Sequence, residues 1–225
     1  TSYIGKILSI IGDAFCRTGD FNNLKGVIEE AKPIIIEFKD IFIQAKINYH
    51  SAQYYLNKRD FKAALSYIDQ SIDQYNLAEQ TRFETQALIE KLTILIESGK
   101  MENAGSIISK IEHLINKLKG TYSNELFTAT KLYIDATNGI ENGDDLNSLF
   151  DSIENTKVKF PLNFPLIYWY LAKTYKAINQ IENANACHKK AKQILNFLAD
   201  RIPGKEDKES FYKVYFHNRI GERLG

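Results

Sequence analysis

Residues 168–191, YWYLAKTYKAINQIENANACHKKA, hold the pattern that decides the fold. Apolar or small side chains recur there at spacings of three and four residues, on both sides of a short turn. They are Tyr168, Leu171, Ala172 and Tyr175 before the turn, and Ala184, His188 and Ala191 after it. This spacing places each set on one face of an α-helix. The stretch therefore predicts two amphipathic helices joined by a tight turn.

The same turn recurs along the chain with a period of about 40 residues, which is typical of helical repeat proteins. Copies lie at residues 19–21, 59–61, 99–101 and 179–181, and the gap before the last holds one more around 142–146, with one residue inserted. Helical spacing flanks every copy, so the chain reads as an all-α series of helical hairpins. The predicted hairpins cover about residues 3–38, 39–78, 79–119, 122–157 and 164–201.

This pattern resembles the tetratricopeptide repeat (TPR), whose first helix reads W-x2-L-G-x2-Y and whose second carries A-x3-F. Residues 168–175 (YWYLAKTY) and 8–15 (LSIIGDAF) follow the first-helix pattern, and the resemblance spans about residues 3–200. It implies a right-handed α-solenoid. The unit here is about 40 residues long, whereas the family's unit is about 34. Units of this length look like those of bacterial regulator sensor arms and peptide-pheromone receptors.

Prolines mark the expected helix boundaries. Pro33 predicts that the second helix of the first hairpin stops or kinks there. Asn163 suits a helix cap and Pro165 a first helical turn. Residues 206–224 read as one capping helix, which would close the exposed end of the stack. We expect a single domain over residues 1–225.

Composition excludes several classes of protein. The 225 residues carry 29 Lys and Arg against 28 Asp and Glu, a net charge of +1, which predicts no nucleic-acid or membrane partner. With 44% apolar residues the chain is not intrinsically disordered. Two cysteines make no disulfide framework, so we expect a cytoplasmic protein. No run approaches the roughly 20 apolar residues of a membrane span. Since the chain starts at Thr1, we expect it to be a segment of a larger protein.

No motif for catalysis, a metal or a cofactor stands out. The sequence lacks H-E-x-x-H, paired cysteines at zinc spacing, a phosphate-binding G-x-x-x-x-G-K-[ST] loop and G-x-S-x-G. Cys187 and His188 point about 100° apart on a helix, and His188 fills the aromatic position of its repeat. We therefore expect no enzyme, no cofactor and no metal site. An enzyme that uses His50 or His188 in a groove remains the less favoured alternative.

The resemblance also implies where a partner binds. In TPR proteins the first helices line a concave groove that takes an extended peptide or a helix. Carried onto this sequence, the groove residues are Lys6, Asp13, Arg17, Lys46, Tyr49, Gln53, Thr93, Tyr133, Trp169, Lys173 and Lys176. Tyr and Trp supply rigid contact area in such interfaces. For Trp169, packing against a neighbouring helix is an equally good interpretation.

We therefore expect a non-catalytic module that binds a protein or peptide in the groove. The long repeat unit favours a regulatory or scaffolding segment of a larger bacterial signalling or transcription-regulatory protein. The alternative is a sensor of the peptide-pheromone type, whose superhelix changes pitch when a peptide binds. The oligomeric state is left open by the sequence.

Overall fold

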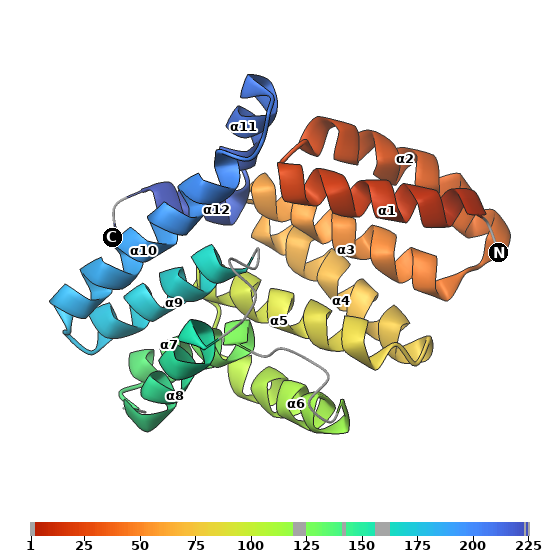
Figure 1. Cartoon of the computed structure of the whole chain (residues 1–225). Coiled ribbons are helices and arrows are strands. Elements are labelled where there is room, and N and C mark those ends of the chain that lie inside the picture. The colour runs from red at the N-terminus through yellow and green to blue at the C-terminus, as the bar shows by residue number, and fades with distance from the viewer. Residues whose placement is uncertain (1–2, 119–124, 141–142, 156–162, 223, 225) are drawn as a thin grey trace. The chain divides into compact units, whose positions relative to one another are not determined.

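Alternating helices and tight turns make up most of the chain in the computed structural model, which describes residues 3–118, 125–140, 143–155, 163–222 and 224 (Figure 1). The described residues hold helices and no β-strand, so the prediction of an all-α protein is confirmed. The chain divides into two compact units. Unit 1 comprises residues 1–122 and 209–215, and unit 2 comprises residues 123–208 and 216–225.

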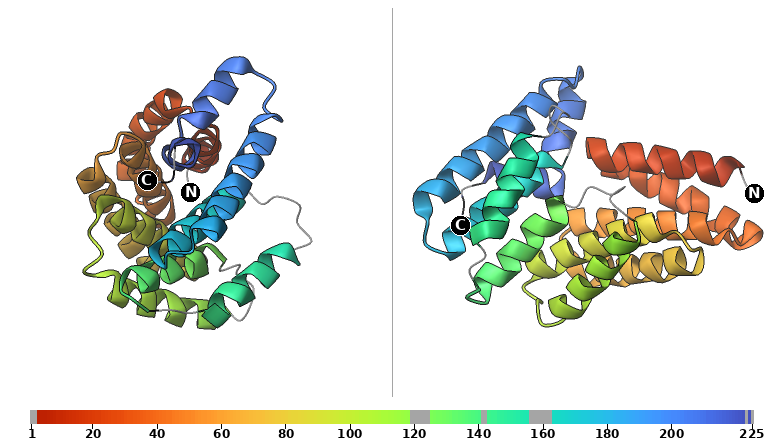
Figure 2. Two further views of the ribbon diagram at one scale, coloured as in Figure 1. Left: turned by 90° about the vertical axis from the view of Figure 1, so that its left-hand side faces the viewer. Right: turned by 60° about the horizontal axis from the view of Figure 1, so that its bottom comes forward.

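Short turns join successive helices in the described ranges 3–117 and 164–221 (Figures 1 and 2). Unit 1 contains α1 (Tyr3–Thr18), α2 (Phe21–Phe38), α3 (Ile41–Asn57), α4 (Phe61–Leu77), α5 (Thr81–Ser98) and α6 (Ala104–Lys117). Unit 2 contains α7 (Glu125–Thr137), α8 (Gly143–Glu154), α9 (Phe164–Ala177) and α10 (Ile181–Ala199). The last two helices are α11 (Lys205–Tyr212) and α12 (Tyr215–Gly221). Each predicted hairpin range holds two helices that contact each other. The prediction of a single domain stays a prediction.

Aspartates fix the start of three helices in unit 1. The carboxylates of Asp20, Asp40 and Asp60 each accept a hydrogen bond from the backbone N–H three residues later, at 3.1, 3.1 and 3.0 Å. These bonds satisfy N–H groups that have no partner inside the helix. Acidic side chains there also interact favourably with the positive end of the helix dipole.

Residues with a left-handed backbone follow many of the described helices, at intervals of 20 or 40 residues along the sequence. Positive φ angles, between 49° and 77°, occur at Gly19, Lys39, Arg59, Glu79, Gly99, Gly139 and Asn179. After most of them the next N–H donates to the carbonyl five residues earlier, as from Gln80 to Tyr75 at 2.9 Å. This is the Schellman arrangement, which turns the chain sharply after a helix. The repeat period found in the sequence thus contains two turns.

The fourth copy of the turn differs from its prediction. Its left-handed residue, Gly139, stands in register with Gly99 and Asn179, and Ile140 N–H donates to the Asp135 carbonyl at 2.9 Å. The extra length therefore comes after this turn, because α8 starts only at Gly143. The sequence-based placement around residues 142–146 put the turn too late.

Of the two outcomes predicted at Pro33, a stop is wrong, and a kink stays a prediction. The helix that contains Pro33 does not stop there but runs on to Phe38. Proline leaves one helical hydrogen bond unmade, and Ile34 and Ile35 beyond it pack against the core. At Asn163 the cap position is confirmed, although its side chain makes no capping bond, and Pro165 lies in the first turn of α9 as predicted.

The predicted closing helix 206–224 is instead the two short helices α11 and α12. Between them, Lys213 N–H donates to the Ser210 carbonyl and Val214 N–H to the Phe211 carbonyl, over three residues instead of four. Val214 also packs against the core of α1 and α2. Tertiary packing therefore sets a break that local helical periodicity does not show.

Glycine permits the closest approach between α1 and α3. A Cβ on Gly12 would lie 2.4 Å from Nδ1 of His50, closer than real Cβ contacts come. Around it, buried side chains form the core of α1, α2 and α3, including Leu8, Leu24 and Ile47. Gly12 occupies the small-residue position of the TPR-like pattern. The close contact it allows brings His50 beside the polar residues of α1.

Candidate functional site

Side chains from successive first helices of the hairpins converge on one cavity in unit 1. The cavity has a volume of about 110 Å³. Its lining consists of Asp13 and Arg17 from α1, Lys46, Tyr49 and His50 from α3, Tyr75 from α4, and Phe83 and Gln86 from α5. We call this the polar cavity. It combines charged groups with aromatic faces, which is the composition expected of a recognition site.

Asp13 organises the charged side of the polar cavity. Its two carboxylate oxygens lie 2.6 Å from Lys46 Nζ and 2.9 Å from His50 Nε2. Burial alone would raise the pKa of Asp13, but hydrogen bonds and charge interactions with His50 and Lys46 outweigh it and lower the pKa to about 2. Asp13 is thus ionised at neutral pH and holds both partners in place.

Aromatic rings form the opposite wall. Phe83 lies 5.5 Å from Tyr75 and 5.2 Å from Phe42 between ring centroids. Lys46 Nζ lies 5.6 Å from the centroid of Phe83, within range of a cation–π interaction. Lys46 therefore bridges the carboxylate of α1 and the aromatic wall. The wall offers a flat apolar surface next to a fixed charge pair.

Glu90 is a second acid of unit 1, one helical turn beyond Gln86 on α5. Its Oε1 is enclosed and has no hydrogen-bond partner among the described residues. Burial raises the pKa of Glu90 to about 7, while a hydrogen bond with Gln53 opposes the rise. Nearby, Gln86 donates to the hydroxyl of Tyr49 at 3.4 Å. The carboxyl of Glu90 therefore changes protonation near neutral pH.

Both cysteines are held in the thiol form. Burial raises the pKa of Cys16, and the negative charges of Asp13 and Glu90 raise it further. Burial likewise raises the pKa of Cys187 to about 11. Because the thiolate is the nucleophile, neither sulfur is activated for covalent chemistry.

Four of the sequence-predicted groove residues meet in the polar cavity: Asp13, Arg17, Lys46 and Tyr49. Gln53 does not line the cavity and forms a hydrogen bond with Glu90 instead. Lys6 is exposed on α1 and does not line the cavity. The structure therefore brings together four of the six residues predicted in the first two hairpins, beside Gln86 from the third.

In unit 2, two other predicted groove residues contact each other. Lys173 Nζ lies 4.4 Å from the ring centroid of Tyr133 and 5.4 Å from that of Tyr170. Lys176 lies half-buried in the last turn of α9. The contacts of Lys173 form a cation–π cluster between α7 and α9.

The last two predicted groove residues are inaccessible to a partner. Thr93 is 0% exposed and its hydroxyl donates to the Glu90 carbonyl at 2.8 Å. Trp169 is 2% exposed and its ring lies 5.4 Å from that of His188. Packing within the molecule, the alternative interpretation for Trp169, accounts for its position. The helix face chosen from the sequence is covered at both positions, which corrects their assignment to an open groove.

Four residues of this region were not among the partner-binding residues predicted from the sequence: His50, Tyr75, Phe83 and Glu90. His50 was considered only for the enzyme alternative. Two of them lie one helical turn from a predicted groove residue, since His50 comes four residues after Lys46 and Glu90 three residues before Thr93. Side chains at this spacing share a helix face. Widening the chosen stripe to its neighbours at these spacings would have found both.

Within the described ranges, no group of three or more His, Cys, Asp or Glu side chains is arranged to hold a metal ion. No described helix combines the length and apolar character needed to cross a membrane. The sequence matches no family model. A search of curated proteins likewise gives no match.

Proposed function

We propose that this chain is a non-catalytic, TPR-like module that binds a peptide or protein segment at the polar cavity of unit 1. The convergence of Asp13, Lys46 and Gln86 from three successive first helices carries the proposal. A segment lying across these helices would meet a fixed charge pair, an aromatic wall and the exposed side chains of Arg17 and Gln86. Rigid aromatic surface beside oriented polar groups favours specific binding.

The histidine geometry supports binding over catalysis. Nε2 of His50 is engaged with Asp13, and Nδ1 is enclosed beside Gly12 without a hydrogen-bond partner among the described residues. A general base must reach the proton that it abstracts. Neither ring nitrogen is open to a bound molecule. With both thiols also held protonated, the polar cavity offers contacts and no activated nucleophile.

The wider role that we propose is that of a regulatory or scaffolding segment in a larger bacterial signalling protein. Its support is the long repeat unit, which is similar to that of bacterial regulator arms. A solenoid of this kind would hold the site rigid through packing between neighbouring repeats.

The proposal is tested by selecting peptides from a displayed library against the whole chain. The selected peptide is then titrated against Arg17→Ala/Gln86→Ala, which removes two exposed side chains at the cavity without touching the core. We expect at least about tenfold weaker binding, because two polar contacts are lost. The control is Lys25→Ala/Glu29→Ala, which removes an exposed ion pair on α2 away from the cavity.

Equal affinity of both double variants would contradict the proposed site, and a failure to select any peptide would contradict the peptide-binding function. Small-angle X-ray scattering with the selected peptide adds a further distinction. A scaffold keeps its radius of gyration when the peptide binds, whereas a sensor of the pheromone-receptor type changes it.

A further inference from the structure

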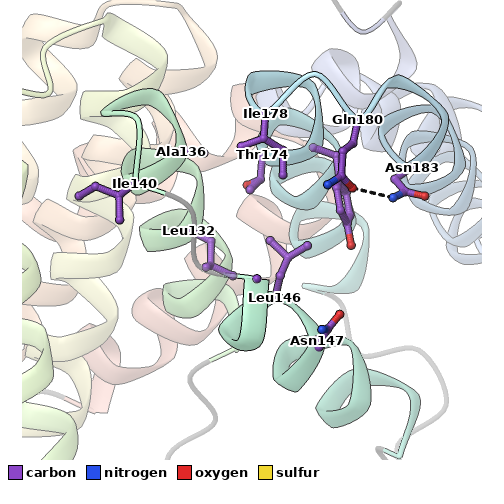
Figure 3. A pocket seen from close by; sticks show the side chains of 11 residues that line it. Leu132, Ala136, Ile140, Leu146, Asn147, Thr174, Ile178, Gln180 and Asn183 are labelled. Carbon is purple, nitrogen blue, oxygen red and sulfur yellow. Dashed lines mark hydrogen bonds between the residues drawn. The ribbon is translucent and has the colours of Figure 1, made fainter.

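A second, larger cavity lies in unit 2 and shares no residue with the polar cavity. It has a volume of about 290 Å³ and lies among α7, α8, α9 and the start of α10 (Figure 3). This volume is near the lower end of the range for small-molecule sites. None of the eleven groove residues named above lines it.

The cavity has an identifiable structural origin. In unit 1, α2 packs against α3, and α4 packs against α5. The second helix of each of the first two hairpins therefore contacts the hairpin that follows. In the described part of unit 2, α9 packs against α7 and α10, whereas α8 makes a smaller contact with α7. By contrast, α8 reaches α9 through a long side chain, since the Phe150 ring lies 6.0 Å from that of Tyr175. Space therefore remains open beside α8.

One side of the cavity is aliphatic. Its walls are formed by Leu132 and Ala136 of α7, Leu146 of α8, and Ile140 and Ile178 from the turns that follow α7 and α9. Leu132 and Leu146 point toward each other in Figure 3. This side suits a short alkyl chain, whose burial is favourable in proportion to its apolar area.

The other side carries a pair of amides. Asn183 Nδ2 donates to Gln180 Oε1 at 2.8 Å, as the dashed line in Figure 3 shows. This bond leaves the Gln180 amino group as a donor and the Asn183 carbonyl as an acceptor, neither with another hydrogen-bond partner among the described residues. A ligand amide carries both an N–H donor and a carbonyl acceptor, so it would pair with both.

None of the described residues that line this cavity is charged. The phenol of Tyr175 remains neutral as well, because burial raises its pKa to about 12. A charged ligand would give up part of its hydration against this lining without gaining an ionic partner, which is unfavourable. The lining therefore selects against carboxylates and ammonium groups.

We propose that this cavity binds a small uncharged molecule with a short aliphatic chain and one amide group. The aliphatic chain lies between Leu132 and Leu146, and the amide pairs with Gln180 and Asn183. The site is separate from the peptide site proposed for unit 1.

The test titrates the ¹⁵N-labelled whole chain with hexanamide and follows the side-chain amide signals of Gln180 and Asn183 by NMR. Hexanoate and hexylammonium serve as charged probes of the same length. We expect hexanamide to bind with a dissociation constant on the order of millimolar, as suits a fragment of its size. Both charged probes should bind at least about tenfold more weakly.

Two matched variants locate the site. Ile140→Trp should block the cavity, and Ile181→Trp is its control, since the two isoleucines are 51% and 52% exposed and only Ile140 lines the cavity. Asn183→Ala should weaken hexanamide binding up to about tenfold through loss of one hydrogen bond. The proposal fails if hexanamide causes no shift, if either charged probe binds equally well, or if Ile140→Trp binds like Ile181→Trp.

Discussion

The missing side chain at Gly12 determines how closely α1 approaches His50. An added Cβ would meet the imidazole at 2.4 Å. We expect Gly12→Ala to lower the free energy of unfolding by about 1–3 kcal/mol, because the ring and the helix must move apart. Urea denaturation followed by circular dichroism measures the change.

Gly26→Ala is the matched control, because Gly26 also lies inside a helix but a Cβ there would have no neighbour within 4 Å. It should raise stability by about 0.5–1 kcal/mol through helix propensity alone. Equal effects of the two substitutions would contradict the close contact at His50.

The contributions of Glu90 and Asp13 to folding stability should depend on pH in opposite directions. The pKa of Glu90 is raised to about 7, so its contribution to stability is complete below pH 4.5 and is lost as the pH rises through 7. We expect Glu90→Gln to be more stable than the parent by about 2 kcal/mol at pH 8 and equally stable at pH 4. Thermal unfolding at both pH values checks this, and a constant difference would contradict it.

The pKa of Asp13 is lowered to about 2, so its stabilisation is present above pH 3.8 and is lost as the pH falls through 2. We expect Asp13→Asn to be less stable than the parent by about 1 kcal/mol at pH 7, a value reduced for the partial exposure of the carboxylate. The difference should shrink between pH 4 and 2 in urea titrations. An unchanged difference would mean that the Lys46 and His50 contacts do not stabilise the ionised form.

At this scale, part of the candidate site was predictable from the sequence. Asp13 and Lys46 follow from the repeat register, which assigns them to the same face of successive first helices. The register also selected Thr93 and Trp169, which are buried. It identifies a helix face but does not show whether another helix covers that face. The contact that joins Asp13 to Lys46 bridges two hairpins, so its formation depends on the tertiary fold.

At the scale of the helix, the left-handed backbone of the turn residues can be tested by substitution. Glu79 has a φ of +54°, which an L-residue adopts at a cost of about 1–2 kcal/mol. Allowing for the greater freedom of glycine in the unfolded chain, Glu79→Gly should raise stability by about 0.5 kcal/mol. The control is Ala78→Gly, where φ is −84° and the substitution should destabilise. Chemical denaturation compares them, and the opposite order would contradict the left-handed turn.

Helix boundaries divide into those that local sequence sets and those that packing sets. The starts at Asp20 and Asp60 were predictable, because a capping carboxylate acts within its own turn. The period of about 40 residues also predicted the hairpin boundaries next to Lys39 and Glu79. It did not show that these two residues adopt a left-handed backbone, since neither is a glycine. The break next to Val214 was also unpredictable, because it depends on contacts with distant helices.

At the scale of the whole molecule, a substitution that destabilises one hairpin should leave the stability of distant hairpins unchanged. Ala172 is fully buried in α9, and Ala172→Leu should overpack its contacts at a loss of about 1–3 kcal/mol. In a chain whose helices contact mainly their neighbours, we expect faster amide hydrogen exchange in α9 and α10 and unchanged exchange in α3 and α4. Ala177→Leu, at an exposed position of the same helix, is the control. Uniform loss of protection would show one cooperative unit.

The even spacing of left-handed residues has a consequence for how such a chain can change its length during evolution. At each of these turns the backbone reverses direction, so removing one helix and its turn would leave every later helix running the opposite way. Excising residues 40–79 instead would join Lys39 to Gln80, one turn boundary to another, and preserve the direction of all that follows. Genetic gain or loss in this protein is therefore compatible with the fold only in steps of two helices.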